Sequence, residues 1–308
     1  MLDVSSHTHQ INLWISLSTP QTTYSDTLAS SGYECDVIED QMYIYDDDDT
    51  EIIHPDVVLT DSTERDHSLV VDCKSNSIDA DQIRRYLRLD EFEDQLITQG
   101  LVSDISTTDL TSEAVLSSFD DLSTHDIPGE IAIVHFENNP YGSFLISNPS
   151  PHDFDDDRLN RALPINVSPS QPLPTGLYPF DIYEADKEAL VASILSSILS
   201  LSIQEGEFSI EDILDRSHPY WDKLGDDKKD ELYRRVEIVY YELLNLGLDE
   251  YLEKVAGTQG SKWRQTSATI QAVQDRTDYY VNRVLDNLPQ ARLDSNAWST
   301  DVDEGEAE

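Results

Sequence analysis

Lysine is nearly absent from the first 186 residues of this chain, where Lys74 is the sole example. The whole sequence has 20 basic and 62 acidic residues, which gives a formal net charge of −42. Such a charge repels itself strongly in dilute buffer. Because hydrophobic residues still make up 38% of the chain, we expect folded cores rather than global disorder. The composition indicates a halophilic protein adapted to molar salt.

Other absences exclude several classes of protein. Two cysteines, Cys35 and Cys73, provide neither a cysteine metal cluster nor a disulfide framework. The most apolar segment, 189–203, is shorter than the roughly 18 residues of a membrane span. The first residues lack the basic region and the long apolar stretch expected of a signal peptide. No phosphate-binding loop, dinucleotide-binding glycine turn, nucleophile elbow or metal-ligand histidine spacing occurs. We therefore expect a soluble, cytoplasmic protein with no membrane partner.

The first half of the chain has the pattern of an α/β domain. Helices are expected at 22–31 and 79–99, and strands at 11–17, 34–45, 52–59, 68–72, 130–136 and 143–147. The runs 52–59 and 68–72 are β-rich and separated by a polar turn, so they should pair as a hairpin. This order predicts a mixed sheet flanked by helices.

The second half is mostly helical. A proline-rich stretch at 149–180 predicts an extended linker. Helices are expected at 189–203, 209–215, 226–246 and 269–288, with a β-hairpin at 251–264 before the last of them. We therefore divide the chain into a domain at 1–148, the linker, a second domain at 181–298 and an acidic disordered tail at 299–308.

Chemistry is concentrated around the lone lysine. Asp72 ends an apolar strand and Lys74 follows two residues later, so both side chains point to one face. In the hairpin, Asp56 would lie beside Asp72. Two carboxylates at one sheet edge can hold a Mg²⁺ ion, and the backbone carbonyl of Cys73 offers a further oxygen ligand. The ammonium of Lys74 can position a nucleophilic water or neutralise charge on a phosphate.

The run Pro55-Asp56, Asp72-Cys73-Lys74, Gln82 and Tyr86 resembles the PD-(D/E)XK nuclease superfamily, over roughly residues 20–136. The resemblance implies a restriction-endonuclease-like fold, Mg²⁺ or Mn²⁺ as cofactor, and catalytic roles for Asp56, Asp72, Lys74 and Gln82. Two interpretations of Gln82 stay open, because Asp79 and Gln82 also have capping-box spacing. Tyr86 fits core packing better than chemistry. The family's first-helix acid has three candidates here: Asp26, Glu34 and Glu39.

The second domain resembles a winged helix-turn-helix, since three helices precede a hairpin. Residues 216–276 hold 10 basic and 11 acidic residues, a net of −1 in a strongly acidic chain. This near-neutral segment predicts an acidic partner. Lys254, Lys262, Trp263 and Arg264 are the candidate nucleic-acid-binding residues. Trp263 has the alternative of packing the hairpin onto the core, and the domain has the alternative of binding protein or forming a homodimer.

These features favour a metal-dependent DNA endonuclease in restriction, defence or mobile-element processing, for which DNA is the partner. Two alternatives belong to other classes. One is a DNA-binding regulator that keeps the nuclease-like core without catalysis, and the other is a protein-interaction scaffold.

Overall fold

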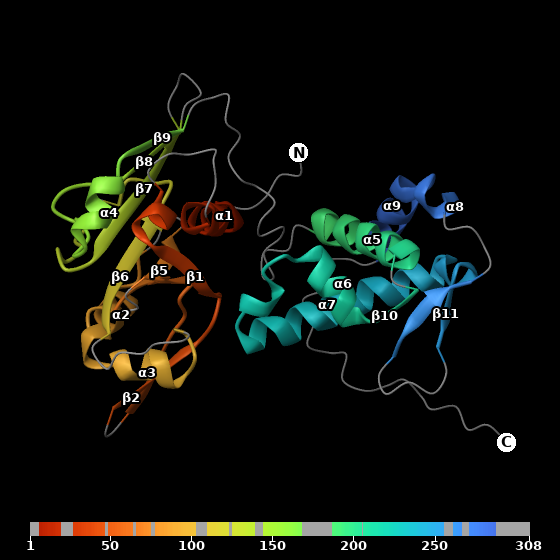
Figure 1. The fold of residues 1–308 in the computed structure, drawn as a ribbon, viewed down its shortest axis with the longest axis horizontal. Coiled ribbons are helices and arrows are strands. Elements are labelled where there is room, and N and C mark those ends of the chain that lie inside the picture. The colour runs from red at the N-terminus through yellow and green to blue at the C-terminus, as the bar shows by residue number, and fades with distance from the viewer. Residues whose placement is uncertain are drawn as a thin grey trace. The chain divides into compact units, whose positions relative to one another are not determined.

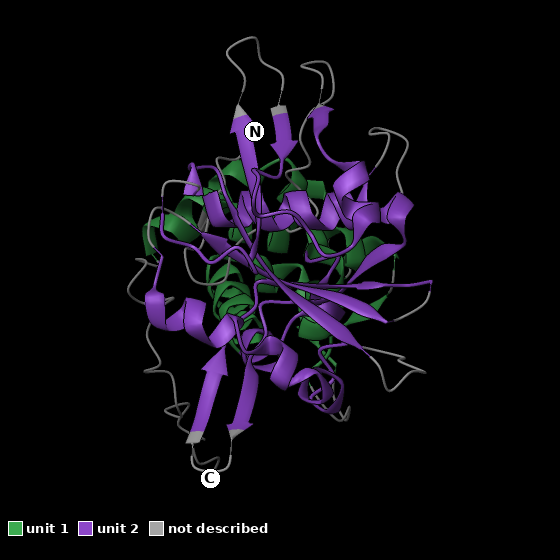
Figure 2. Cartoon of the chain, turned by 90° about the vertical axis from the view of Figure 1, so that its left-hand side faces the viewer, with its two compact units in different colours: residues 1–2, 182–217, 231–308 green, residues 3–181, 218–230 purple. Residues whose placement is uncertain are grey.

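The computed structural model describes residues 6–19, 27–46, 49–63, 66–74, 78–102, 110–122, 125–138, 144–167, 187–204, 206–255, 261–266 and 271–287. The chain divides into two compact units, coloured separately in Figure 2. Unit 1 comprises residues 1–2, 182–217 and 231–308, and unit 2 comprises residues 3–181 and 218–230.

Unit 2 is built on a seven-stranded mixed sheet (Figure 1). Its order is β1 (Tyr33–Ile38), β4 (Val57–Asp61), β5 (His67–Lys74), β6 (Thr111–Ser118), β7 (Ala132–Asn138), β8 (Phe144–Ser147) and β9 (Ile165–Val167). Strands β5, β6 and β7 run parallel to one another, and the other neighbouring pairs are antiparallel. The predicted α/β class and the predicted pairing of β4 with β5 are confirmed.

Helices cover the two faces of this sheet. Helix α1 (Ser6–Ser18) lies on one face, where the Trp14 indole donates to Ser117 Oγ on β6 at 3.0 Å. The other face carries α2 (Ala80–Tyr86), the short 3-10 helix η2 (Leu89–Glu91), α3 (Glu93–Thr98) and a separate hairpin of β2 (Met42–Asp46) and β3 (Asp49–Ile53). Ile83 and Leu96 pack there with Val70 and Leu116 of the sheet.

The hairpin is held at both edges by side chains. On β2, Gln99 and Gln95 of the α3 region bond the backbone amides and carbonyls of Tyr43 and Tyr45. On β3, Arg85 Nη1 donates to the carbonyl of Ile52 at 2.7 Å. These bonds satisfy backbone groups that would otherwise be open at strand edges.

Residues 11–17 form part of helix α1, so the strand predicted there is wrong. The helix is buried almost all round, including the polar residues Asn12 and Ser16. Asn12 and Ser18 bond to carbonyls of the helix backbone, and Gln10 bonds to the sheet through the Lys74 carbonyl and Ser117 Oγ. A helix that is buried on every side has no polar stripe, and its chance alternation of apolar and polar residues imitates a strand.

Two other predicted elements are divided in the structure. The segment 34–45 contains β1 and β2, which belong to different sheets. The segment 79–99 contains α2, η2 and α3, because the chain turns at Arg88 and Phe92 to bring Leu89 and Phe92 into the core. The helix predicted at 22–31 is described only from residue 27, where Leu28–Ser31 forms a 3-10 helix, η1.

The proposed linker begins too early. Residues 149–167 contain α4 (Asp157–Ala162) and β9, which completes the main sheet. Phe154, Leu159 and Ile165 are buried. The prolines at 149, 151 and 164 lie outside those elements, so a segment rich in proline still contains a helix and a strand. Residues 168–186 and the acidic tail lie outside the described residues.

Unit 1 combines helices with a small sheet. It contains α5 (Lys187–Gln204), α6 (Ile210–Ser217), most of α7 (Asp226–Asn245), η5 (Leu248–Glu250), α8 (Gln271–Gln274) and α9 (Thr277–Asn287). The sheet order is β10 (Glu207–Phe208), β12 (Trp263–Gln265) and β11 (Leu252–Lys254). The predicted helices at 189–203, 209–215 and 226–246 and the predicted hairpin are confirmed. The single helix predicted at 269–288 is divided into α8 and α9 by a turn at 275–276. In the described parts of the chain, no helix combines the length and apolarity needed to cross a membrane.

The segment 218–230 carries a pH-sensitive residue of unit 2. His218, which precedes the 3-10 helix η4 (Trp221–Lys223), is fully buried. Burial lowers its pKa from 6.5 to about 3. The unfolded chain therefore binds a proton at this residue between pH 6.5 and 3 while the folded chain does not. The free energy of unfolding should fall as pH drops through this window, by up to about 1.4 kcal/mol per pH unit.

A buried apolar replacement tests this prediction. His218→Phe should remove that part of the pH dependence, measured by urea unfolding between pH 7 and 4 at constant salt. The exposed His125→Phe is the control. Equal pH slopes for His218→Phe and the wild type would contradict the assignment.

Candidate active site

The antiparallel pairing of β4 with β5 brings Asp56 and Asp72 to the same edge of the sheet. Val57 pairs with Val71, so each strand delivers its aspartate one residue beyond that pair. The Asp56 amide donates to the carbonyl of Val71 at 2.8 Å, and Asp56 Oδ2 accepts from the amide of Cys73 at 2.6 Å. Backbone bonds thus fix the Asp56 carboxylate against β5.

Lys74 lies beside both Asp72 and Gln82. Its Nζ is 2.6 Å from Asp72 Oδ2 and donates to Gln82 Oε1 on α2 at 2.5 Å. The Asp72 and Lys74 side chains are 6% and 9% exposed. Asp79 caps α2 by accepting from the amide of Asp81, and Gln82 is turned toward Lys74. The structure therefore brings together the four residues that sequence reasoning named as catalytic.

Two further residues complete the site. His7, in the first turn of α1, has its Nε2 at 3.0 Å from Asp56 Oδ1. Glu39 follows β1, and its amide donates to the carbonyl of Asp56 at 2.9 Å. The ligand atoms of His7, Glu39 and Asp56 all lie within 4.8 Å of one another. The first helix thus contributes a histidine where the resemblance implies an acid.

Sequence reasoning missed His7 because it assigned the following residues to a strand. Glu39 was one of three candidates, and the fold distinguishes it from Glu34, which lies within β1. Asp26 lies outside the described residues. The single local signal for Glu39 is its backbone: it adopts φ 48°, a left-handed conformation that costs a residue with a side chain about 1 kcal/mol or more.

The donor set fits a divalent cation. One imidazole and two carboxylates are ligands that Mn²⁺ and other first-row ions accept, and carboxylates alone suit Mg²⁺. The three ligand atoms lie within 4.8 Å of one another, so these side chains would need only small movements to hold one ion together. Lys228 Nζ, 3.2 Å from Glu39 Oε1, already neutralises part of the negative charge here.

The electrostatics of the site centre on Asp72. Burial, followed by the neighbouring Asp56 carboxylate, raises its pKa to about 7 against the opposing effect of Lys74. The carboxyl group is therefore poised between its two protonation states near neutral pH. A cation bound beside it would favour the ionised form, so cation binding and proton release should be coupled.

Other residues named from the sequence have structural roles. Tyr86 is buried in the core, with its hydroxyl donating to the carbonyl of His54. Cys73 is buried, its Sγ accepts from Ser117 Oγ, and burial raises the pKa of its thiol well above the usual value. In unit 1, Trp263 is 4% exposed and packs against Tyr240, which is the packing role left open above.

The remaining candidates for nucleic-acid binding lie near that tryptophan on the small sheet. Lys254 is exposed, Lys262 is partly exposed, and Arg264 forms an exposed ion pair with Glu253 at 2.7 Å. Pairs of this kind contribute little to stability and can be exchanged for other partners.

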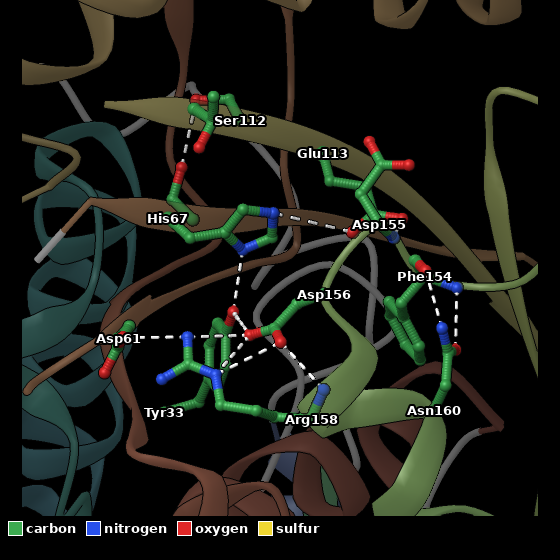
Figure 3. A network of polar contacts seen from close by, with 12 residues as sticks. Tyr33, Asp61, His67, Ser112, Glu113, Phe154, Asp155, Asp156, Arg158 and Asn160 are labelled. Carbon is green, nitrogen blue, oxygen red and sulfur yellow. Dashed lines mark hydrogen bonds and ion pairs between the residues drawn. The ribbon is translucent and has the colours of Figure 1, made fainter. Parts of the chain in front are cut away.

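A second polar cluster lies at the opposite end of the same strands (Figure 3). The Tyr33 hydroxyl contacts His67 Nδ1 at 2.7 Å and donates to Asp156 Oδ2 at 2.8 Å. Arg158 Nη2 lies 2.7 Å from Asp156 and 3.0 Å from Asp61, which is fully buried. These bonds join α4 to the ends of β1 and β4. The cluster is closed to solvent at its centre, and its role is structural.

Comparison with known proteins assigns more than half of the chain to a family. Residues 6–178, more than half of the sequence, match the model of the MJECL32 domain. The chain belongs to the MJECL32 family. An uncharacterized MJECL32 protein of Methanocaldococcus jannaschii is 27% identical over 200 residues, which cover 62% of this chain. This chain spans 44% of that relative's length. Residues 183–296 match a domain of unknown function, DUF8601. No solved structure matches the chain.

Proposed function

We propose that this MJECL32-family chain is a metal-dependent DNA endonuclease with a PD-(D/E)XK site on a restriction-endonuclease-like sheet. The observation that carries the proposal is the meeting of Asp56, Asp72 and Lys74 at one sheet edge with two additional ligand groups, His7 and Glu39. Buried charged groups cost free energy, and a fold keeps them together where chemistry requires them.

Each residue has a distinct part in the proposed hydrolysis. His7, Glu39 and Asp56 would hold a divalent cation, with Asp72 beside them. When bound, such an ion polarises a phosphoryl oxygen and lowers the pKa of water. Lys74 orients the attacking water and neutralises charge that develops on the phosphate. Gln82 is a positioning residue, because its amide oxygen accepts from Lys74 Nζ and fixes the direction of the ammonium group.

We further infer that unit 1 is a winged-helix-like module. Its support is the order of elements, in which α5, α6 and α7 precede the β11–β12 hairpin. Lys254 and Arg264 lie on that hairpin and Lys262 directly precedes β12, and all three would contact the phosphates of DNA. Binding of a protein partner through the same module is the alternative. If the module binds DNA, a Lys254→Glu, Lys262→Glu variant should shift DNA less than the wild type does in a gel. An unchanged gel shift would favour the protein partner.

Neutralising Asp56 should abolish both cation binding and cleavage. Asp56→Asn keeps the shape of the side chain but removes the charge that the cation needs, so Mn²⁺ affinity should fall at least about 10-fold. Electron paramagnetic resonance of Mn²⁺ with the full chain measures this binding, and nicking of supercoiled plasmid in molar KCl measures cleavage. His7→Ala should weaken binding and remove the nitrogen coupling of the bound ion.

Asp66→Asn is the matched control, because it removes the same charge just before the other end of β5. It should bind Mn²⁺ and nick plasmid as the wild type does. Unchanged plasmid nicking by Asp56→Asn would disprove the proposed site.

A further inference from the structure

Three basic residues of unit 2 lie together on a surface that shares helix α2 with the site. Residues 1–186 contain seven basic residues, and three of them, Arg84, Arg85 and Arg88, lie within five positions on or just after α2. They line a groove of about 590 Å³ together with Thr50, Glu51, Ile52, Asp79 and Asp81. The same helix directs Gln82 to Lys74, so the groove and the site share α2.

The three arginines are held to different degrees. Arg85 is fixed, because it donates to the carbonyls of Ile52 and Asp81. Arg84 is 73% exposed and pairs with Asp81, which is 74% exposed. Arg88 lies 3.0 Å from Glu91 and 3.6 Å from Glu51. The Arg84 pair is exposed and therefore weak, so Arg84 can turn to a phosphate at little cost. Arg88 is 30% exposed and also lies over the Phe92 ring, so it is held more firmly at the edge of the groove.

Two exposed tyrosines lie on the hairpin that forms the other wall of the groove. Tyr43 and Tyr45 are 36% and 59% exposed, and their rings are stacked with centroids 6.2 Å apart at 16°. They pair across the hairpin with Ile52 and Thr50, which line the groove, and paired residues share a face of a sheet. The third large exposed apolar residue described in unit 2, Leu87, directly follows α2.

We propose that this hairpin–α2 surface, formed by Tyr43, Tyr45, Arg84 and Arg88, binds an unpaired strand of DNA and leads it toward Lys74. Bases would stack on the tyrosines and phosphates would contact the arginines. A duplex hides the faces of its bases, so stacking selects a single strand. That the strand leads toward Lys74 rests on the proposed function. Binding of the strand is argued from the residues of the surface alone.

The acidic composition is compatible with such binding in molar salt. The Debye length falls to about 3 Å at 1 M, so the negative charge elsewhere on the chain is screened. Direct arginine contacts persist at short range, and base stacking depends little on salt. The acidic groups that line the groove, Glu51, Asp79 and Asp81, are balanced by its three arginines.

Fluorescence anisotropy tests the proposal with a labelled 12-nucleotide single strand of mixed sequence and with its duplex. The full chain is used in molar KCl and EDTA, where metal-dependent cleavage is prevented. The wild type should bind the single strand more tightly than the duplex. A Tyr43→Ala, Tyr45→Ala variant should bind the single strand at least about 10-fold more weakly. Arg84→Glu should make the slope of log K against log[KCl] less steep by about 0.7, because one phosphate contact is lost.

Matched variants guard against general effects. Tyr279→Ala removes a tyrosine that is 42% exposed in unit 1, and Arg161→Glu reverses an exposed charge on α4; both should leave binding unchanged. Tyr45→Leu keeps an apolar side chain at that position but removes the aromatic ring. It should still weaken binding, because a folded hairpin without that ring cannot stack a base. Tighter binding of the duplex, or full binding by the tyrosine and Arg84 variants, would overturn the proposal. Strand binding without metal-dependent cleavage of either plasmid or single-stranded DNA would instead overturn the proposed function.

Discussion

Replacing Lys74 by methionine is expected to lower the rate of metal-dependent DNA cleavage by roughly 10²–10³-fold. The methionine keeps most of the apolar stem and removes the ammonium group that contacts Asp72 and Gln82. Transition-state charge on the phosphate then loses the stabilisation that the Lys74 ammonium group supplies. Single-turnover cleavage of a labelled substrate, at saturating Mg²⁺ in molar KCl, measures this loss.

Binding and folding should survive the same change. The pKa of Asp72 is already raised to about 7, so that carboxyl can take up a proton when Lys74 is lost. Lys74→Ala serves as a second variant, and affinity for uncleaved DNA in EDTA serves as the second readout. Arg161→Met, on α4, is the control for loss of a basic residue. Cleavage by both Lys74 variants within a few-fold of the wild-type rate would rule out a catalytic lysine.

Replacing Arg158 by leucine is expected to destabilise unit 2 by roughly 2–3 kcal/mol. Asp61 is fully buried, and Arg158 is its ion-pair partner at 3.0 Å. Without the guanidinium, Asp61 keeps its bond from the amide of Thr63 but must hold its charge in the interior or take up a proton. Asp156 loses the same partner. We place the cost below that of a fully buried pair because the Arg158 side chain is 36% exposed.

Denaturant unfolding measures this cost, and Arg161→Leu is the matched control. Both arginines lie on α4, but Arg161 is exposed and donates to the carbonyl of Asp157 in its own helix. Its replacement should change the free energy of unfolding by no more than about 0.5 kcal/mol. Equal stability of the two variants would show that the cluster in Figure 3 contributes nothing through Arg158.

The sequence was most informative where local pattern and tertiary environment agree. One apolar run follows Asp56 and another ends at Asp72. Both were predictable as strands that pair, because both strands are buried on two faces. Their pairing then placed two carboxylates and Lys74 together. The helices of unit 1 were equally clear, because their buried residues recur at 3- and 4-residue spacing.

The remainder depended on contacts between distant segments. His7 contacts Asp56 only because α1 lies across the sheet, and the polar residues buried in α1 concealed its helical nature. Glu39 joins the site through a left-handed turn that residue types do not predict. The arginines on and just after α2 line a groove only because β3, which is distant in sequence, forms its other side. The prolines after residue 148 predicted a linker there. The first domain extends further, because α4 and β9 form between the prolines.

The most direct test of the central claim is cleavage of supercoiled plasmid by the wild-type chain in molar KCl, with Mg²⁺, with Mn²⁺ and with EDTA. The account predicts nicking with either ion, faster with Mn²⁺ because His7 supplies a nitrogen ligand, and none with EDTA. Nicking that persists in EDTA, or intact plasmid and intact single-stranded DNA under every condition, would contradict it.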